Sequence, residues 1–193
     1  MRVFMRNIII LLALTLCSSC KLRTFDIQKA PLKPDQAVVF DIDGTLTPKP
    51  SAYSTARDDA ARAALLYADN GYKIIYLTAR RKIFQFVIPG WLKKNGFPEG
   101  SIQVTQTSAD GSDHAAFKER LLEEYQQNGW HFIAAYGDSS TDFEAYSAVG
   151  IDKDRVFALR RAGEGSCQPG IWALCLDSWS NHLQRITEIV KPW

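Results

Sequence analysis

A short apolar run that ends in two carboxylates constrains the fold of this chain most strongly. Residues 37–42 are apolar except for Asp41, and Asp43 follows one position later. Such a run, bounded by polar residues, is typical of a strand buried on both faces of a sheet. Asp41 and Asp43 would then lie at its carboxyl end with both side chains on one face, because alternate residues share a face. Open α/β sheets bind ligands at that edge, so the run predicts a site there.

The two carboxylates are close enough to repel one another, so the pair needs a cation, a shared proton or an electrophile. Mg²⁺ fits best, because it takes hard oxygen ligands and leaves room for water and a substrate phosphate. Gly44 permits a sharp exit from the strand, and the loop that continues through Thr45 exposes N–H groups that can hold an anion. The alternative is an ordinary turn in which one Asp caps the loop and the other is solvated.

Predicted strands and helices alternate along the chain, which indicates an α/β domain with a mostly parallel sheet. The apolar patterns predict strands at residues 37–42, 72–77, 102–105, 132–136 and 155–159. The first helix is expected to be capped by Ser54 or Thr55 and to end at Asn70-Gly71, and a second helical stretch is broken by Pro89-Gly90 and runs on to Lys94. Further helices are expected at residues 114–127, 141–149 and 180–190.

The amino terminus has the pattern of a secretory signal. Arg2 and Arg6 precede an apolar core at residues 8–16, which is too short to span a bilayer. The small residues before Cys20 resemble a bacterial lipobox, which implies lipidation of Cys20. Lys21 stands where an inner-membrane lipoprotein carries Asp, so the resemblance implies an exported, periplasmic protein anchored to the outer membrane. The alternatives are an ordinary cleaved signal and an uncleaved anchor.

We therefore expect a signal peptide at residues 1–19, a tether at 20–36 and one domain at 37–193. Without residues 1–19 the chain has 21 Lys and Arg against 21 Asp and Glu, so its composition indicates no nucleic-acid partner. Cys167 and Cys175 lie eight residues apart in a compartment that permits oxidation. They are expected to form a disulfide or to remain two buried thiols.

Four motifs follow one another in order along the chain. They are Asp41-Ile42-Asp43-Gly44-Thr45, Thr78 at the end of a hydrophobic strand, Lys118 in a helix, and Gly137-Asp138 with Asp142 four positions later. In this order the chain resembles a phosphohydrolase of the haloacid dehalogenase (HAD) superfamily. The resemblance implies a Rossmann-like three-layer sandwich. Only 35 positions separate Asp43 from Thr78 and 40 separate Thr78 from Lys118, so neither gap holds a substantial cap domain.

The chemistry and the resemblance imply the same roles for the acidic residues. Asp41 would attack phosphorus and form an aspartyl-phosphate, which divides a hard hydrolysis into two steps. Asp43 would protonate the leaving oxygen and then deprotonate the incoming water. Mg²⁺ would be held by Asp41, by the Asp43 carbonyl and by Asp138. Asp142 would orient Lys118 or a metal-bound water. Alternatively, Asp138 and Asp142 are the N-cap and first-turn acids of a helix.

The remaining motif residues are expected to bind the phosphoryl group. Thr78 would donate a hydrogen bond to it and Lys118 would neutralise its charge. The alternatives are a helix-capping threonine and a solvated lysine. Arg80, with Arg81 and Lys82, would bind a head-group phosphate, or the three would be solvated charges. The expected substrate-binding residues are Gly44, Thr45, Thr78, Ala79, Arg80 and Lys118.

A closer resemblance covers most of residues 37–165. Segments 71–80, 96–100 and 141–151 resemble the catalytic domain of lipins and the related LNS2 domain of phosphatidylinositol transfer proteins. Lipins are Mg²⁺-dependent phosphatidate phosphatases, so the resemblance implies a phosphatidate-like lipid substrate, and lipins typically carry Asn where this chain has Asp138. The alternatives are a periplasmic acid phosphatase for soluble nucleotides or sugar phosphates and a non-catalytic phosphatidate-binding module.

Overall fold

A six-stranded parallel sheet organises the protein. The computed structural model describes residues 27–191, so the expected signal peptide at 1–19 and Cys20 lie outside it. The strands are β1 (Gln36–Phe40), β2 (Lys73–Arg81), β3 (Ser101–Thr105), β4 (His131–Gly137), β5 (Val156–Leu159) and β6 (Leu174–Leu176). They lie in the order β3-β2-β1-β4-β5-β6, and all five pairings are parallel. The predicted α/β class with a mostly parallel sheet is confirmed.

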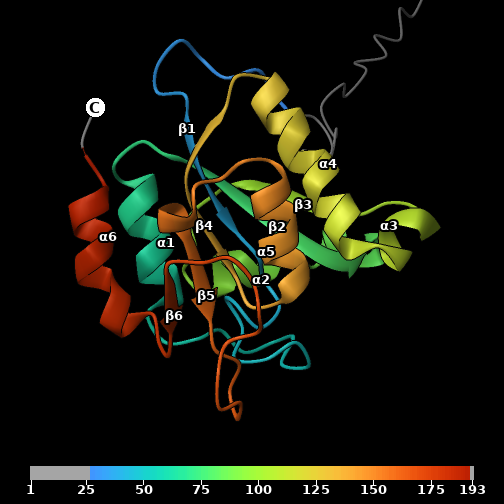
Figure 1. Cartoon of the computed structure of the whole chain (residues 1–193), viewed down its shortest axis with the longest axis vertical. Helices are drawn as coiled ribbons and strands as arrows, with labels where there is room; N and C mark the ends of the chain where they lie inside the picture. The colour runs from blue at the N-terminus through green and yellow to red at the C-terminus, as the bar shows by residue number, and fades with distance from the viewer. Residues whose placement is uncertain (1–26, 192–193) are drawn as a thin grey trace, which may run out of the picture.

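Helices cover both faces of this sheet and complete three layers. The α-helices are α1 (Ala60–Ala68), α2 (Ile88–Lys94), α3 (Ser108–Ser112), α4 (His114–Gln127), α5 (Ser140–Ala148) and α6 (Leu183–Ile189), and the 3-10 helices are η1 (Lys82–Phe86), η2 (Lys153–Arg155) and η3 (Ser180–His182). Figure 1 shows α1 and α6 on one face and α4 and α5 on the other. Among the described residues, no helix is long and apolar enough to cross a membrane.

The side chains of β1 alternate between two hydrophobic cores, as expected for a central strand. Val38 and Phe40 belong to the core beneath α1 and α6, whereas Ala37 and Val39 belong to the core beneath α4 and α5. All four are fully buried. This burial on both faces explains why the run is continuously apolar, and it fixes the position of the strand end that precedes the acidic loop.

Three predicted boundaries were wrong, and the first is that of β1, which ends at Phe40, two residues before the predicted end. Helix α1 begins at Ala60, and neither Ser54 nor Thr55 caps it. Residues 54–59 are held differently, because the Arg57 backbone N–H donates to the Leu46 carbonyl and the Arg57 side chain binds the same loop. Strand β2 continues through Arg81, which pairs with β3, so residues 78–80 lie inside the strand instead of after it.

The structure contains two short elements that the sequence pattern did not predict. Strand β6 has only three residues, and α3 is a five-residue helix with a capping box between Thr107 and Asp110. Cys167 and Cys175 form a disulfide with Cα atoms 5.8 Å apart. This bond ties the loop after β5 to β6. Neither short element has enough residues to give a clear periodicity.

Candidate active site

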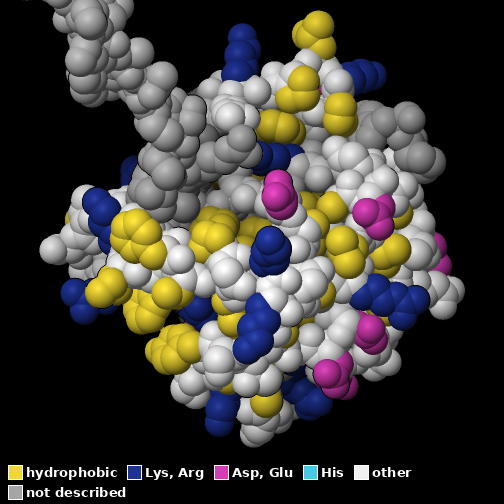
Figure 2. Space-filling model, turned by 180° about the vertical axis from the view of Figure 1, so that it is seen from behind, with side chains coloured by type: hydrophobic (Ala, Val, Ile, Leu, Met, Phe, Trp, Pro, Cys, Tyr) yellow, Lys and Arg dark blue, Asp and Glu magenta, His cyan; other side chains and the backbone are white. Residues whose placement is uncertain are grey.

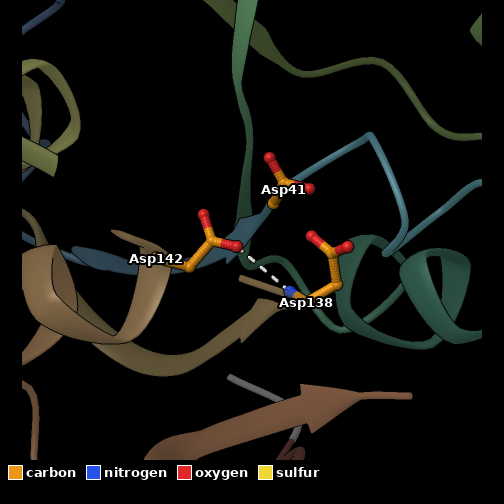
Figure 3. A group of neighbouring side chains, drawn as sticks. All are labelled: Asp41, Asp138 and Asp142. Atoms are coloured by element: carbon orange, nitrogen blue, oxygen red, sulfur yellow. Dashed lines mark hydrogen bonds between the residues drawn. The ribbon is translucent and has the colours of Figure 1, made fainter. Parts of the chain in front are cut away.

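Three buried carboxylates meet at the carboxyl ends of the central strands. Asp41 follows β1, Asp138 follows β4 and Asp142 lies in the first turn of α5 (Figure 3). One oxygen atom of each side chain lies within 4.8 Å of the others. β1 and β4 are neighbours in the sheet, so their parallel pairing brings the residues that follow them to one edge. Asp138 and Asp142 are 97 and 101 positions away from Asp41 in the sequence, and the fold brings all three together.

Asp142 is held by the helix that it helps to start. Ser139 caps α5, and one Asp142 oxygen accepts hydrogen bonds from the backbone N–H groups of Asp138 and Ser139, both at 3.0 Å. The other oxygen accepts from the Lys118 ammonium. Both readings of Asp142 therefore apply, because it is a first-turn acid and also a partner of Lys118. Its two oxygens are therefore both engaged in hydrogen bonds.

Lys118 links two of the carboxylates. Its Nζ atom donates to Asp41 Oδ1 at 2.7 Å and also to Asp142, and its side chain is 3% exposed. Burial disfavours the ammonium, but the two carboxylates outweigh that effect and raise the pKa of Lys118. The alternative of a solvated lysine on a helical face is therefore wrong.

Asp41 retains one free oxygen in this buried environment. Its Oδ2 atom is buried and has no hydrogen-bond partner among the described residues. Burial raises the pKa of Asp41 well above its usual value, the carboxylates of Asp142 and Asp138 raise it further, and Lys118 opposes them. A buried carboxylate oxygen without a donor is well placed to bind a cation or to attack an electrophile.

Asp138 is a second buried carboxylate in this group. Arg161 Nε donates to its Oδ2 atom, and burial, together with Asp142, raises the pKa of Asp138 to about 6. The loop after β1 approaches closely, since a Cβ atom on Gly44 would lie 1.8 Å from this carboxylate. Gly44 also has a φ of +85°, a conformation that side chains disfavour. Oxygen ligands from Asp41 and Asp138 fit Mg²⁺.

Asp43 has different neighbours from Asp41. The Arg80 guanidinium binds its carboxylate through Nε at 2.9 Å and Nη2 at 2.7 Å, and Thr78 Oγ1 donates to it at 2.9 Å. The guanidinium also lies 5.3 Å from the ring centre of Tyr53 and 6.0 Å from that of Trp91. Arg80 is therefore a buried partner of Asp43 and not a solvated charge, whereas Arg81 and Lys82 are exposed.

Gly44 and Thr45 in the loop after β1 differ in the groups that they leave free. The Gly44 N–H donates to Thr47 Oγ1 at 2.8 Å, so this amide already has an acceptor. Thr45 is fully buried, and its Oγ1 atom has no hydrogen-bond partner among the described residues. Of the two predicted phosphate-binding residues in this loop, Thr45 thus offers an unpaired group. Ala79 lies in β2 between Thr78 and Arg80.

Two arginines that sequence reasoning missed complete the site. Arg57 donates to the carbonyls of Gly44 at 2.7 Å and Arg160 at 2.7 Å, and it also binds those of Thr47 and Pro48. Burial lowers its pKa, while Asp138 opposes the change. Arg57 therefore clamps the loop after β1 to the loop after β5. The position of Arg161 two residues beyond β5, at the ligand edge of the sheet, was the only sequence signal for either residue.

Comparison with known proteins agrees with this geometry. Residues 38–160 match the family described as "PITM 1-3, LNS2 domain", which is well over half of the chain. The chain belongs to the LNS2 domain family. The matched region of this LNS2 domain contains all four predicted motifs, from Asp41 to Asp142. The predicted resemblance to LNS2-type domains is confirmed.

The LNS2 domain is also similar to parts of several curated proteins. It is 35% identical to Drosophila melanogaster protein retinal degeneration B over 67% of this chain and 10% of that protein. It is 30% identical to human membrane-associated phosphatidylinositol transfer protein 1, over 66% of this chain and 10% of that protein. It is 30% identical to human phosphatidate phosphatase LPIN3, over 67% and 18%. The chain thus spans less than a fifth of these relatives' length.

Solved structures confirm the fold. A Mesorhizobium loti protein described as a HAD-like phosphatase has a TM-score of 0.57 and 17% identity, over 85% of this chain and 89% of that chain. A chain of the Pnkp1/Rnl/Hen1 RNA repair complex gives 0.56 and 17%, over 72% and 48%. These values support the predicted HAD-like sandwich, and the described residues contain no inserted cap domain between β1 and α4.

Proposed function

We propose that this LNS2 domain is a Mg²⁺-dependent phosphatase that hydrolyses a phosphomonoester through an aspartyl-phosphate at Asp41. The observation that carries the proposal is the free Asp41 Oδ2 atom, which is buried beside a lysine and two further carboxylates. A purely structural ion pair would leave no oxygen unpaired in such a site, because an unsatisfied buried carboxylate oxygen is costly. The similarity to phosphatidate phosphatase LPIN3 supports the same class of reaction.

The reaction would proceed in two displacements. Asp41 Oδ2 would form a bond to phosphorus as the bond to the leaving oxygen breaks, and Asp43 would donate a proton to that oxygen. Asp43 would then take a proton from a water molecule, which attacks phosphorus and releases inorganic phosphate and free Asp41. Lys118 would hold Asp41 in position and stabilise the negative charge that develops on the phosphoryl oxygens. Asp142 would keep Lys118 oriented.

Asp41 and Asp138, with the backbone carbonyl of Asp43, would hold the Mg²⁺. Their side chains fit a hard cation, because they are buried carboxylates with oxygen atoms within 4.8 Å of one another, and burial together with nearby carboxylates raises the pKa of both groups. A bound Mg²⁺ supplies positive charge that offsets the repulsion between the carboxylates and an anionic phosphate. Asp142 is a poorer ligand, since Lys118 and three donors near the start of α5 already occupy its oxygens.

A phosphatidate-like lipid is our preferred substrate. The relatives include a phosphatidate phosphatase and a membrane-associated phosphatidylinositol transfer protein. The absence of an inserted domain over the described site leaves room for a bulky substrate. Soluble nucleotides or sugar phosphates are the alternative substrates. We also propose that the protein is exported, that a lipid is attached at Cys20 and that the protein is located at the outer membrane. Residues 1–26, which carry this proposal, lie outside the described structure.

One observation favours a second function, a phosphatidate-binding module without turnover. Arg80 binds both oxygens of Asp43, so the proposed acid is not free to donate a proton in this arrangement. Catalysis requires Arg80 to release Asp43, and binding alone does not. A phosphate that competes for the guanidinium would provide that release.

Phosphate release by the full chain tests the proposal. Short-chain phosphatidate and a nucleoside monophosphate are compared, each with Mg²⁺ and with a chelator, and Asp41→Asn serves as the control. We expect Mg²⁺-dependent release from phosphatidate that Asp41→Asn abolishes while its circular dichroism spectrum is unchanged. Release that favours the nucleotide would reject the lipid substrate but keep the chemistry. No release from either compound, with retained phosphatidate binding, would favour the binding module.

A further inference from the structure

The segment that follows β2 exposes an unusual group of hydrophobic side chains. Ile83 is 72% exposed, Phe86 is 64% exposed and Val87 is 57% exposed, all within five consecutive positions of η1 and its carboxyl end. We call these three residues the η1 patch. Ile88, the next residue, is fully buried and fixes the segment to the core. The three side chains are therefore presented to solvent by an anchored backbone, without a partner from the core.

Positively charged residues flank the η1 patch in the sequence. Arg81 and Lys82 precede it and Lys93 and Lys94 follow it at the end of α2, and all four are exposed. No Asp or Glu occurs between Arg81 and Pro98. On the face opposite to that of Figure 1, Figure 2 shows Lys and Arg side chains, and also several Asp and Glu side chains, close to hydrophobic ones. Exposed apolar groups rimmed by cations match the chemistry of an anionic lipid surface.

The η1 patch is connected to the candidate site by direct contacts. Phe84 of η1 stacks on Tyr53, with ring centres 6.2 Å apart and planes at 11°. Tyr53 in turn lies over the Arg80 guanidinium, which binds Asp43. A surface that receives the patch would therefore lie next to the loop that carries the proposed acid.

We propose that the η1 patch docks this domain onto an anionic membrane, with Ile83, Phe86 and Val87 inserted at the boundary between headgroups and acyl chains. The proposal rests on the lipid-phosphate substrate proposed above, since it explains how a site built from buried carboxylates meets a phosphate held in a bilayer. Electrostatic attraction by the four cations would bring the domain to the surface, and the apolar side chains would hold it there. A second copy of this chain is the competing occupant.

The test separates docking from chemistry. All proteins are the full chain with Cys20→Ala, so that no lipid is attached. The double variant Ile83→Asp, Phe86→Asp is compared with Leu65→Asp, a matched control at an exposed hydrophobic residue of α1. Each protein is assayed with phosphatidate in vesicles of phosphatidylcholine and phosphatidylglycerol and with soluble para-nitrophenyl phosphate. We expect the double variant to lose about tenfold or more of its vesicle activity and to keep its soluble activity, because membrane affinity scales with inserted apolar area. The control should keep both.

A second measurement does not depend on catalysis. Phe86→Trp and Leu65→Trp are mixed with the same vesicles containing brominated phosphatidylcholine, which quenches inserted tryptophan. Greater quenching at position 86 than at position 65 would support docking even if no substrate were cleaved, in which case only the proposed function would fail. Equal quenching at both positions, or unchanged vesicle activity in the double variant with soluble activity intact, would overturn the docking proposal. Loss of a dimer in the double variant without any quenching at position 86 would assign the patch to a second copy and overturn it as well.

Discussion

Replacing Asp138 by Asn should stabilise the metal-free protein and weaken its response to Mg²⁺. Asp138 is 3% exposed, and burial, together with the Asp142 carboxylate, raises its pKa from 3.8 to about 6 although Arg161 opposes this change. An amide has nearly the shape of a protonated carboxyl and carries no charge. Asp138→Asn therefore removes a buried charge and leaves an oxygen that can still accept from Arg161.

The expected magnitude follows from the pKa. One pKa unit corresponds to about 1.4 kcal/mol, so a rise from 3.8 to about 6 means that ionising Asp138 costs the folded protein about 3 kcal/mol relative to the unfolded chain. Below pH 3.8 the carboxyl is protonated in both states, and the cost is absent. As pH rises through 6 the folded state must also give up the proton, and the full cost is present at pH 8.

Urea unfolding at pH 8 measures this difference. With a chelator, we expect Asp138→Asn to exceed the wild type by as much as about 3 kcal/mol, with the difference vanishing near pH 4. With Mg²⁺ the wild type should gain stability, because the cation binds only the folded arrangement of carboxylates, and the variant should gain less. A variant less stable than the wild type at pH 8 with a chelator would refute the reasoning. So would an equal gain from Mg²⁺ in both proteins.

Three further substitutions test other parts of the site and core. Lys118→Met leaves Asp41 and Asp142 buried without their cation, so we expect a loss of about 3 to 5 kcal/mol in urea unfolding and no turnover. Arg57→Ala leaves four loop carbonyls without this donor and should lower stability by about 1 to 3 kcal/mol, with Arg57→Lys giving little rescue in the same assay. Burial, with Arg185, lowers the pKa of His182 from 6.5 to about 4, so the stability of the wild type relative to His182→Phe should fall by about 2 kcal/mol from pH 7 to pH 5 when both proteins are unfolded in urea.

The elements predicted well from sequence were those with capping residues at their ends or a continuous apolar run. Helix α4 has the predicted bounds, His114–Gln127, because Asp113 caps its start and Asn128-Gly129 ends it. Strand β1 was recognisable because burial on both faces requires a continuous apolar run. The meeting of Asp41 and Asp142 also followed from sequence, since parallel strands bring residues after their carboxyl ends to one edge. Lys118 lies inside α4, and its place in the site followed from the resemblance to HAD phosphohydrolases.

Contacts between distant loops were not predictable in the same way. Arg57 binds the carbonyl of Arg160, which is 103 positions away, and any backbone carbonyl looks the same in the sequence. This contact also moved the start of α1, because it holds the preceding residues in a loop. The partner of Arg80 was undetermined for a related reason, since an arginine beside a strand end suits a carboxylate or a phosphate equally well.

Two carboxylates of the proposed mechanism, Asp43 and Asp138, are each bound by an arginine that has to move before the carboxylate can act. Arg80 occupies Asp43, and Arg161 occupies one oxygen of Asp138. A cation that used the same Asp138 oxygen would have to displace Arg161, and proton donation by Asp43 would require Arg80 to move. Both displaced guanidinium groups would then lie beside an incoming phosphate, which accepts bidentate hydrogen bonds as a carboxylate does. Cation binding alone would leave Arg161 without its carboxylate, and an incoming phosphate would give it a new anionic partner, so cation and phosphate binding should favour one another.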